Sequence, residues 1–285
     1  MITIRAYAKL NLYLQITGSR VDGYHDLDMI MQSIDLHDTL RLSRAGDIQL
    51  TCSHPEVPLG ESNIAHKAAR RFFRETGIAG GVHADIQKRI PMAAGLGGGS
   101  ADGAAMLRGL NCLYGYPLSE RRLLALAAGI GADVPFSLTG GCRRAQGIGE
   151  RLTSLRNQLP GVYLLLKPEG GVSTKDAYQT YDARLAPEPY AMEECMRALE
   201  TGDLAAFSRH TFNSLQHPAA SLCPEIAALL RFLQNTAPAS FLTGSGSTCV
   251  GLFSSQEEAE AARRCAPACA FSYIAKNEDC GLRLS

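Results

Sequence analysis

Residues 91–102 of this chain read PMAAGLGGGSAD, and this stretch is the most informative part of the sequence about the fold. It follows a strand-like run, Val82 to Ile90, and leads into a helix-like run, Ala101 to Tyr114. Glycine occupies four of the five positions 95–99, which lets backbone N–H groups turn inward without a clash at Cβ. We predict that Ser100 caps the following helix. Inward-facing amides at a helix N-terminus bind phosphate, so the stretch predicts a phosphate-binding loop.

Two better-known phosphate motifs do not fit this loop. No Lys-Ser or Lys-Thr pair follows the glycines, as a Walker-type loop requires. Ser100 stands where the third glycine of the dinucleotide-binding G-x-G-x-x-G motif would be. On composition alone, a flexible glycine turn without a ligand is the alternative. The cradle, as residues 91–101 are called below, therefore predicts a different nucleotide-binding fold.

The composition excludes several classes of protein. The 285 residues are 46% hydrophobic and 20% charged with a net charge of zero, which is typical of a globular protein and argues against nucleic-acid or acidic-membrane partners. No apolar run approaches the ~20 residues of a membrane span, and we expect no signal peptide. Nine cysteines without a C-x-x-C pair indicate reduced thiols and a cytoplasmic location. The seven histidines lack zinc-ligand spacing, so we expect no structural metal.

Strand-like and helix-like segments alternate irregularly in both halves of the chain, which predicts an α+β protein. Alternation predicts strands over 2–6 and 10–16, and a strand pair over 29–42 with Asp35 and Asp38 near its turn. Helices are predicted over 64–76, behind Asn63, and over 119–128. The second half predicts helices over 191–199, 204–215, 226–235 and 256–265, and strands over 240–243, 248–253 and 270–274. We expect two domains, residues 1–159 and 160–285.

Two charged residues are candidates for catalysis. Lys9 lies in an apolar strand-like segment, where a lysine is more often a surface residue whose stem lies along the protein. Asp133 precedes Val134 and a proline, where an aspartate is more often a turn or cap residue. If the fold brings them together, a carboxylate beside a lysine stays ionised at neutral pH and can accept a hydroxyl proton.

Two further loops are candidates for ligand binding. Arg20 to His25 places Tyr24 and His25 next to each other, a combination suited to stacking on a flat heterocycle and hydrogen bonding to its edge. A packed loop with a structural histidine is the alternative. Residues 244–247, Gly-Ser-Gly-Ser, form either a second anion-binding nest or a plain hairpin turn.

These pieces, in this order, resemble the GHMP kinase superfamily, whose members phosphorylate small metabolites. The resemblance extends over nearly the whole chain, through residues 6–12, 20–25, 33–36, 63–65, the cradle, 131–136 and 242–246. The cradle alone is typical of the superfamily. The Lys-x-Asn strand together with Asp-Gly-Tyr-His is more specific, and it resembles the branch that phosphorylates a cytidine-diphosphate-linked erythritol in the non-mevalonate route to isoprenoid precursors.

The resemblance implies a two-domain α+β fold, with an N-terminal ribosomal-S5-like nucleotide domain and a C-terminal ferredoxin-like domain. It implies that Asp133 accepts or orients the hydroxyl proton while Lys9 holds Asp133 and neutralises developing charge. The implied co-substrate is ATP, with Mg²⁺ bridging its phosphates and no residue assigned as a metal ligand. The implied ATP-binding residues of the cradle are Pro91, Met92, Ala93, Ala94, Gly95, Leu96, Gly97, Gly98, Gly99, Ser100 and Ala101.

The remaining site residues follow from the same resemblance. Asn63 and Lys88 match adenine-side contacts, and Asn11, Tyr24 and His25 match cytidine-side contacts. The alignment of a second stacking aromatic with Tyr178 is looser. A monomer or weak homodimer is expected.

Three residues depart from the family pattern: Gly103 in place of alanine, Arg143 in place of a small residue, and Ser214 in place of aspartate. Two other functions stay open. One is another small-metabolite kinase of the superfamily, of the homoserine or mevalonate type, and the other is a non-catalytic nucleotide-binding protein on the same fold.

Overall fold

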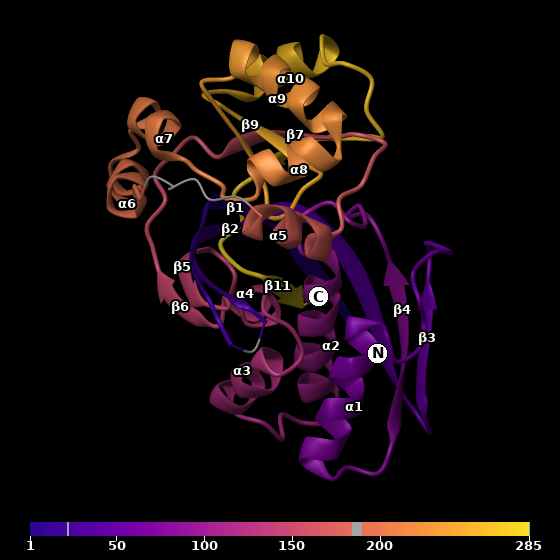
Figure 1. The fold of residues 1–285 in the computed structure, drawn as a ribbon. Coiled ribbons are helices and arrows are strands. Elements are labelled where there is room, and N and C mark those ends of the chain that lie inside the picture. The colour runs from indigo at the N-terminus through magenta and orange to yellow at the C-terminus, as the bar shows by residue number, and fades with distance from the viewer. Residues whose placement is uncertain (22, 184–189, 285) are drawn as a thin grey trace.

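The structure, a computed structural model, describes residues 1–21, 23–183 and 190–284. Its first part is built on a seven-stranded sheet in the order β11-β1-β2-β4-β3, with β5 paired to β2 and β6 paired to β5. The strands are β1 (Ile2–Ser19), β2 (His25–Ala45), β3 (Ile48–Cys52), β4 (Gly81–Gln87), β5 (Cys142–Gly147), β6 (Arg151–Ser154) and β11 (Leu282–Leu284). Figure 1 shows α1 (Ile64–Thr76) and α2 (Gly98–Leu113) lying side by side against this sheet, with α3 (Glu120–Ala128) and α4 (Val134–Thr139) nearby.

The second part is a four-stranded antiparallel sheet in the order β10-β7-β9-β8. Its strands are β7 (Val162–Lys167), β8 (Ala239–Leu242), β9 (Cys249–Phe253) and β10 (Phe271–Lys276). Its helices are α5 (Thr174–Asp182), α6 (Met192–Thr201), α7 (Leu204–His210), α8 (Gln216–Leu222), α9 (Pro224–Thr236) and α10 (Gln256–Arg264). Helices follow the first and third of these strands, which gives the ferredoxin-like arrangement. The α+β fold class with its two parts is therefore confirmed.

The last strand that the structure describes, β11, lies in the first sheet, where it pairs with β1. Before it, the Lys276 amide donates to Asp35 Oδ1 and the Glu278 amide donates to the Ser33 carbonyl. The chain after β10 therefore packs on the first part. The boundary at residues 159 and 160 stays a prediction.

Residues 2–16 and 29–42 were each expected to form two strands, but they lie in the single long strands β1 and β2, so both predictions are wrong. In β1, residues 6–16 are all buried, and the polar–apolar alternation that marks a half-exposed strand is lost. Register shifts between Tyr7 and Ala8 and between Asn11 and Tyr13 adjust the pairing of β1 with β2. Asp38 lies within β2, fully buried, rather than at a turn.

Two predicted helix features differ from the structure. α2 begins at Gly98 behind Gly97, whose φ of 72° is left-handed, and Ser100 lies inside the first turn; the predicted Ser100 cap is therefore wrong. The helix expected over 204–215 ends at His210, because Asn213 bridges to Leu14 of β1. The sequence analysis also missed α5, although Ser173 accepts from the Asp176 amide as the N-cap of that helix.

The three departures from the family pattern each have a structural role. A Cβ at Gly103 would lie 2.6 Å from Ile64 Cγ2, so glycine allows α2 to approach α1 closely. Arg143 donates to the Gly140 carbonyl, and the Ser214 hydroxyl accepts from the Ile16 amide. Within the described ranges, no helix combines the length and apolarity that crossing a membrane requires.

Candidate active site

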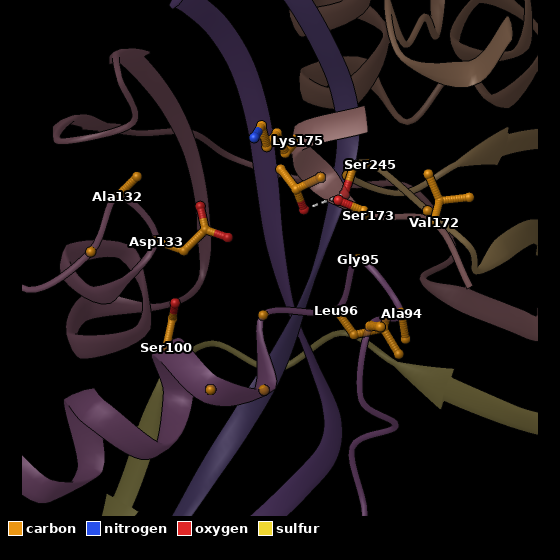
Figure 2. Close-up of a pocket in the computed structure, with 18 of the residues that line it drawn as sticks. Ala94, Gly95, Leu96, Ser100, Ala132, Asp133, Val172, Ser173, Lys175 and Ser245 are labelled. Carbon is orange, nitrogen blue, oxygen red and sulfur yellow. Dashed lines mark hydrogen bonds between the residues drawn. The ribbon is translucent and has the colours of Figure 1, made fainter. Parts of the chain in front are cut away.

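A pocket of about 1140 Å³ lies between the two parts of the molecule. Residues of the first sheet, the cradle, α5 and the β8–β9 loop line it, and Figure 2 shows the labelled cradle residues together with Asp133 and Lys175 around it. The pocket brings together every predicted site residue except Ala101. Ala101 lies in α2 and is fully buried.

The cradle has the backbone geometry of an anion-binding nest. Ala93, Gly95 and Gly97 have positive φ values of 48°, 74° and 72°, alternating with residues of ordinary φ. Such alternation turns successive N–H groups toward one side. None of the amides of residues 95–100 donates a hydrogen bond to a described residue. The first amides of α2 have no intrahelical acceptor, so the cradle presents a row of unpaired donors to the pocket.

Contacts from both parts of the protein hold the cradle in place. The Lys9 amide donates to the Leu96 carbonyl at 3.0 Å, and the Thr248 amide donates to the Ala94 carbonyl at 3.3 Å. A Cβ at Gly95 would lie 2.1 Å from the Thr243 carbonyl oxygen. β1 and the β8–β9 loop therefore support the cradle from behind, and its shape depends on both.

Lys9 and Asp133, 124 positions apart in sequence, meet in the pocket. Their Nζ and Oδ2 atoms are 3.5 Å apart, and the exposed side-chain fractions are 7% and 30%. Lys9 is therefore not a surface lysine. Asp133 occupies the N-cap position of α4, but its side chain makes no capping bond, so the carboxylate stays available to the pocket.

The Lys9 side chain is positioned from several sides. Its stem packs over Gly97, where a Cβ would lie 2.9 Å from Lys9 Cγ. Its ammonium donates to Asn11 Oδ1. Asn11 in turn donates through Nδ2 to Met29 Sδ at 3.4 Å, and its backbone amide donates to Thr243 Oγ1 at 2.9 Å. The lysine is therefore held between the cradle and the Asp133 carboxylate.

The candidate base-binding residues lie at the other end of the pocket. Tyr24 is 59% exposed, while the His25 and Tyr178 rings stack with centroids 4.8 Å apart. His25 Nε2 lies 2.7 Å from Asp182 Oδ1. Burial raises the pKa of Tyr178, and the charge of Asp133 raises it further. Tyr178 and Asp133 therefore face the same part of the pocket. Asp22 of the Asp-Gly-Tyr-His motif lies outside the described residues.

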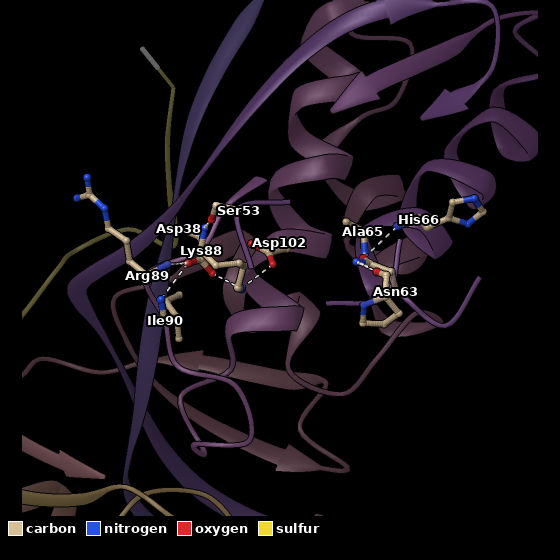
Figure 3. Close-up of polar contacts among 10 residues, drawn as sticks. Asp38, Ser53, Asn63, Ala65, His66, Lys88, Arg89, Ile90 and Asp102 are labelled. Carbon is tan, nitrogen blue, oxygen red and sulfur yellow. Dashed lines mark hydrogen bonds and ion pairs between the residues drawn. The ribbon is translucent and has the colours of Figure 1, made fainter. Parts of the chain in front are cut away.

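Asn63 and Lys88 both line the pocket, but their polar atoms are engaged by the protein itself (Figure 3). Asn63 caps α1, accepting from the amides of Ala65 and His66, and its Nδ2 donates to the Pro58 carbonyl. Lys88 forms ion pairs with Asp38 and Asp102. Their contact with a nucleotide stays a prediction.

Pocket residues of α5 and the turn before it, other than Tyr178, were missed by sequence analysis. Thr174 Oγ1 and Ser245 Oγ are 2.9 Å apart and join α5 to the β8–β9 loop across the pocket. Gly244 to Gly246, for which the sequence analysis left an anion-binding nest and a plain hairpin turn open, line the pocket beside the cradle. The Ser173–Asp176 capping pattern is the signal that would have located α5. Within the described residues, no group of three or more His, Cys, Asp or Glu side chains is arranged to hold a metal ion.

Comparison with known proteins identifies relatives for both parts of the chain. The family models "GHMP kinases N terminal domain" and "GHMP kinases C terminal" match residues 63–141 and 195–270. The 4-diphosphocytidyl-2-C-methyl-D-erythritol kinase of Desulfitobacterium hafniense (strain Y51) is 41% identical over 258 residues, covering 90% of this chain and 88% of the relative. The protein of the same name from Synechococcus sp. (strain JA-3-3Ab) is 43% identical, with 92% and 88% covered.

Solved structures have the same fold. A 4-(cytidine 5'-diphospho)-2C-methyl-D-erythritol kinase matches with a TM-score of 0.81 and 32% identity, over 96% of this chain and 98% of that one. A homoserine kinase from Cytophaga hutchinsonii matches with a TM-score of 0.78 and 18% identity, over 100% and 97%. The second match shows a shared fold alone.

Proposed function

The chain belongs to the GHMP kinase family, and on that premise we propose that it transfers the γ-phosphoryl group of ATP to the 2-hydroxyl of 4-diphosphocytidyl-2-C-methyl-D-erythritol. This reaction is a step of the non-mevalonate route to isoprenoid precursors. The observation that carries the proposal is the meeting, in one pocket, of the cradle, the Lys9–Asp133 pair and the Tyr24–His25 loop. A cytoplasmic location accords with the reduced cysteines, and all nine are free thiols.

Asp133 and Lys9 have different roles in the proposed reaction. The oxygen of the substrate hydroxyl forms a bond to the γ-phosphorus while Asp133 accepts the hydroxyl proton. The bond between the γ-phosphorus and the bridging oxygen of ATP breaks, and ADP leaves. The Lys9 ammonium, 3.5 Å from that carboxylate, holds it and balances negative charge on the transferring group. The pair and the cradle line the same pocket, which supports a reaction between a hydroxyl beside Asp133 and a phosphate on the cradle.

The backbone amides of the cradle are the groups that would donate hydrogen bonds to the β- and γ-phosphates of ATP. Mg²⁺ would enter with ATP as part of the co-substrate and would reduce the negative charge of the phosphates. Because the net charge of the chain is zero, local geometry rather than a broad basic surface attracts the anion.

Product analysis tests the function directly. Phosphorus NMR of a reaction with ATP, Mg²⁺ and the cytidine-diphosphate substrate should show a new phosphomonoester signal together with ADP. Mevalonate and homoserine serve as matched acceptors for the two alternative kinase activities. Turnover of either control at a comparable rate would contradict the proposal, and ATP binding without turnover of any acceptor would favour the non-catalytic alternative.

We propose that the cytosine ring binds between Tyr24 and Tyr178, with His25 reading its polar edge. The His25 ring already covers one face of Tyr178, so the base is expected on the opposite face of that ring or in the place that His25 vacates. Because His25 Nε2 is hydrogen-bonded to Asp182, Nδ1 is the ring nitrogen that would contact the edge of the base.

We expect Tyr24→Ala to raise the KM for the cytidine substrate roughly ten- to a hundred-fold, because stacking a base on an aromatic ring is worth ~1–3 kcal/mol. Tyr24 is 59% exposed, so the loss should reflect binding rather than unfolding. Tyr24→Phe is the matched control and should be mild, since the ring remains. His25→Ala should reduce discrimination between cytidine and uridine substrates. A raised KM for ATP with an unchanged KM for the cytidine substrate would mean that this pocket binds ATP and not the cytosine base.

A further inference from the structure

Beneath the cradle lies a buried charged cluster that the proposed mechanism does not use. It consists of Asp38 from β2, Lys88 after β4, and Asp102 in α2 (Figure 3). The exposed side-chain fractions are 0% for Asp38 and 6% each for Lys88 and Asp102. Two carboxylates share one ammonium, so the cluster is one positive charge short of neutrality if both carboxylates are ionised. Buried uncompensated charge is costly, so added negative charge nearby favours proton uptake by the cluster.

The hydrogen bonds indicate which carboxyl holds that proton. Asp38 accepts from three donors, the Lys88 ammonium and the amides of Arg89 and Ile90. Asp102 accepts from Lys88 alone, at 2.8 Å through Oδ2, and its Oδ1 atom is buried with no hydrogen-bond partner in the described residues. Donors stabilise the ionised form of a carboxyl, and an unpartnered buried oxygen does not. Asp102 is therefore the carboxyl of this cluster that takes up a proton more readily.

The groups around the cluster do not supply the missing positive charge. Lys88 and Asp38 are the described charged groups that act on Asp102, and Cys52 of β3 is the other titratable group beside them. The face of α1 that packs inward consists of Ala65, Ala68, Ala69 and Phe72. Burial raises the pKa of Asp102 to about 7, with Lys88 lowering it and Asp38 raising it. Burial lowers the pKa of Lys88, but the two carboxylates outweigh burial and the net shift is upward.

The cluster is close enough to sense a nucleotide. Lys88 Nζ lies 3.3 Å from the position a Cβ would take at Gly98, the first residue of α2 and a member of the cradle. Asp102 lies one helical turn further along α2, roughly 6 Å deeper by the ordinary helical rise. Phosphates on the cradle would add negative charge within about 10 Å of the buried Asp102, and interactions with buried charges are screened less than those at the surface. A nearby negative charge favours the protonated form of a carboxyl.

We propose that Asp102 is a positioning residue that binds a proton when ATP occupies the cradle, so that nucleotide binding and proton uptake are coupled. When Asp102 is neutral, the charge of Lys88 is shared between Asp38 and the phosphates, while the contact of Lys88 with Asp102 still holds α2 beneath the cradle. This inference rests on the proposed function only in that the cradle binds ATP. It assigns to the chain a pH-dependent nucleotide affinity: because the bound form holds the proton more tightly, affinity falls as pH rises above about 7.

The test is calorimetric binding of a non-hydrolysable ATP analogue with Mg²⁺ to the full chain, in buffers of different ionisation enthalpy. We expect uptake of roughly half a proton per nucleotide at pH 7.5, because the bound phosphates raise the pKa of this carboxyl further. Uptake should fall toward zero at pH 5.5, where Asp102 already carries its proton. The dissociation constant of the native protein should increase steadily between pH 7 and 9.

Variants separate a proton-binding role from a merely structural one. Asp102→Asn mimics the protonated acid, so nucleotide affinity should survive while proton uptake and the pH dependence of binding disappear. Asp85→Asn, on β4 and outside the pocket, is the matched control and should keep the native proton count. Uptake in Asp102→Asn equal to that of the native protein, or native binding without uptake between pH 6 and 9, would overturn the proposal. If the native chain binds no nucleotide at all, the proposed function fails with it.

Should Asp102→Asn fail to fold, the native protein still decides the question. Difference infrared spectra with and without the nucleotide at pH 7.5 should gain a band of a protonated carboxyl group on binding. A spectrum without such a band, together with a dissociation constant that does not change between pH 7 and 9, would exclude proton binding at this cluster.

Discussion

Replacing Asp133 by asparagine should lower kcat by about 10²–10⁴, the usual contribution of a positioned general base. The isosteric amide cannot accept the hydroxyl proton, and the Lys9 ammonium loses the carboxylate 3.5 Å away. KM values for ATP and for the cytidine substrate should change little, because Asp133 makes no capping bond whose loss would disturb α4. Steady-state kinetics with both substrates, together with calorimetric binding of the cytidine substrate, gives the comparison.

Asp176→Asn is the matched control for this variant. Asp176 is an exposed aspartate in the first turn of α5 and does not line the pocket, so its amide variant should keep native kinetics. Near-native turnover by Asp133→Asn would end its assignment as the base. A loss of the same size in both variants would point to disturbance of the fold rather than to chemistry.

Replacing Gly95 by alanine should raise the KM for ATP at least about tenfold. Gly95 has a φ of 74°, where a residue with a Cβ is strained by ~1–2 kcal/mol, and its Cβ would lie 2.1 Å from the Thr243 carbonyl oxygen. That carbonyl belongs to the backbone behind the cradle, so the cradle must shift and its amides must leave the phosphate positions. Calorimetry of each ligand alone should show weakened nucleotide binding and nearly unchanged binding of the cytidine substrate.

Gly46→Ala controls for the substitution itself. Gly46 lies in the turn between β2 and β3, its φ is not positive, and its Cβ would meet nothing within 4 Å. This variant should match the native protein in both binding measurements. Equal weakening of both ligands by Gly95→Ala would mean that the domain had unfolded, and the role of the cradle would then have no support from this variant.

Elements with a strong local signal were predictable from the sequence. The amphipathic spacing behind the Asn63 cap predicted α1, and the structure has that helix from Ile64 to Thr76. The hairpin of β8 and β9 was predicted near its observed bounds. Both depend on neighbours within a few residues, such as caps, turn residues and periodicity, which the sequence contains directly.

Long-range burial decided the elements that were predicted wrongly. β1 and β2 are single long strands because both of their faces are covered over much of their length, and such strands lose the alternation that pattern analysis requires. The helix predicted over 204–215 ends at His210, because the chain after it pairs with Leu14 of β1. The side-chain amide of Asn213 also donates to the carbonyls of Leu242 in β8 and Gly244 in the β8–β9 loop. No local pattern contains such a partner.

The candidate site shows the same division. Residue types, spacing and family resemblance were enough to name the cradle, Lys9, Asp133 and the Tyr24–His25 loop. Which glycines of the cradle are indispensable was decided by tertiary structure, since Gly95 and Gly97 have positive φ while Gly98 is helical. The sharing of Lys88 by Asp38 and Asp102 was likewise set by packing, because three separate elements supply these side chains. The sequence by itself determines which chemical groups the site contains. Their distances, burial and charge balance depend on contacts between segments far apart in the chain, which only the tertiary structure brings together.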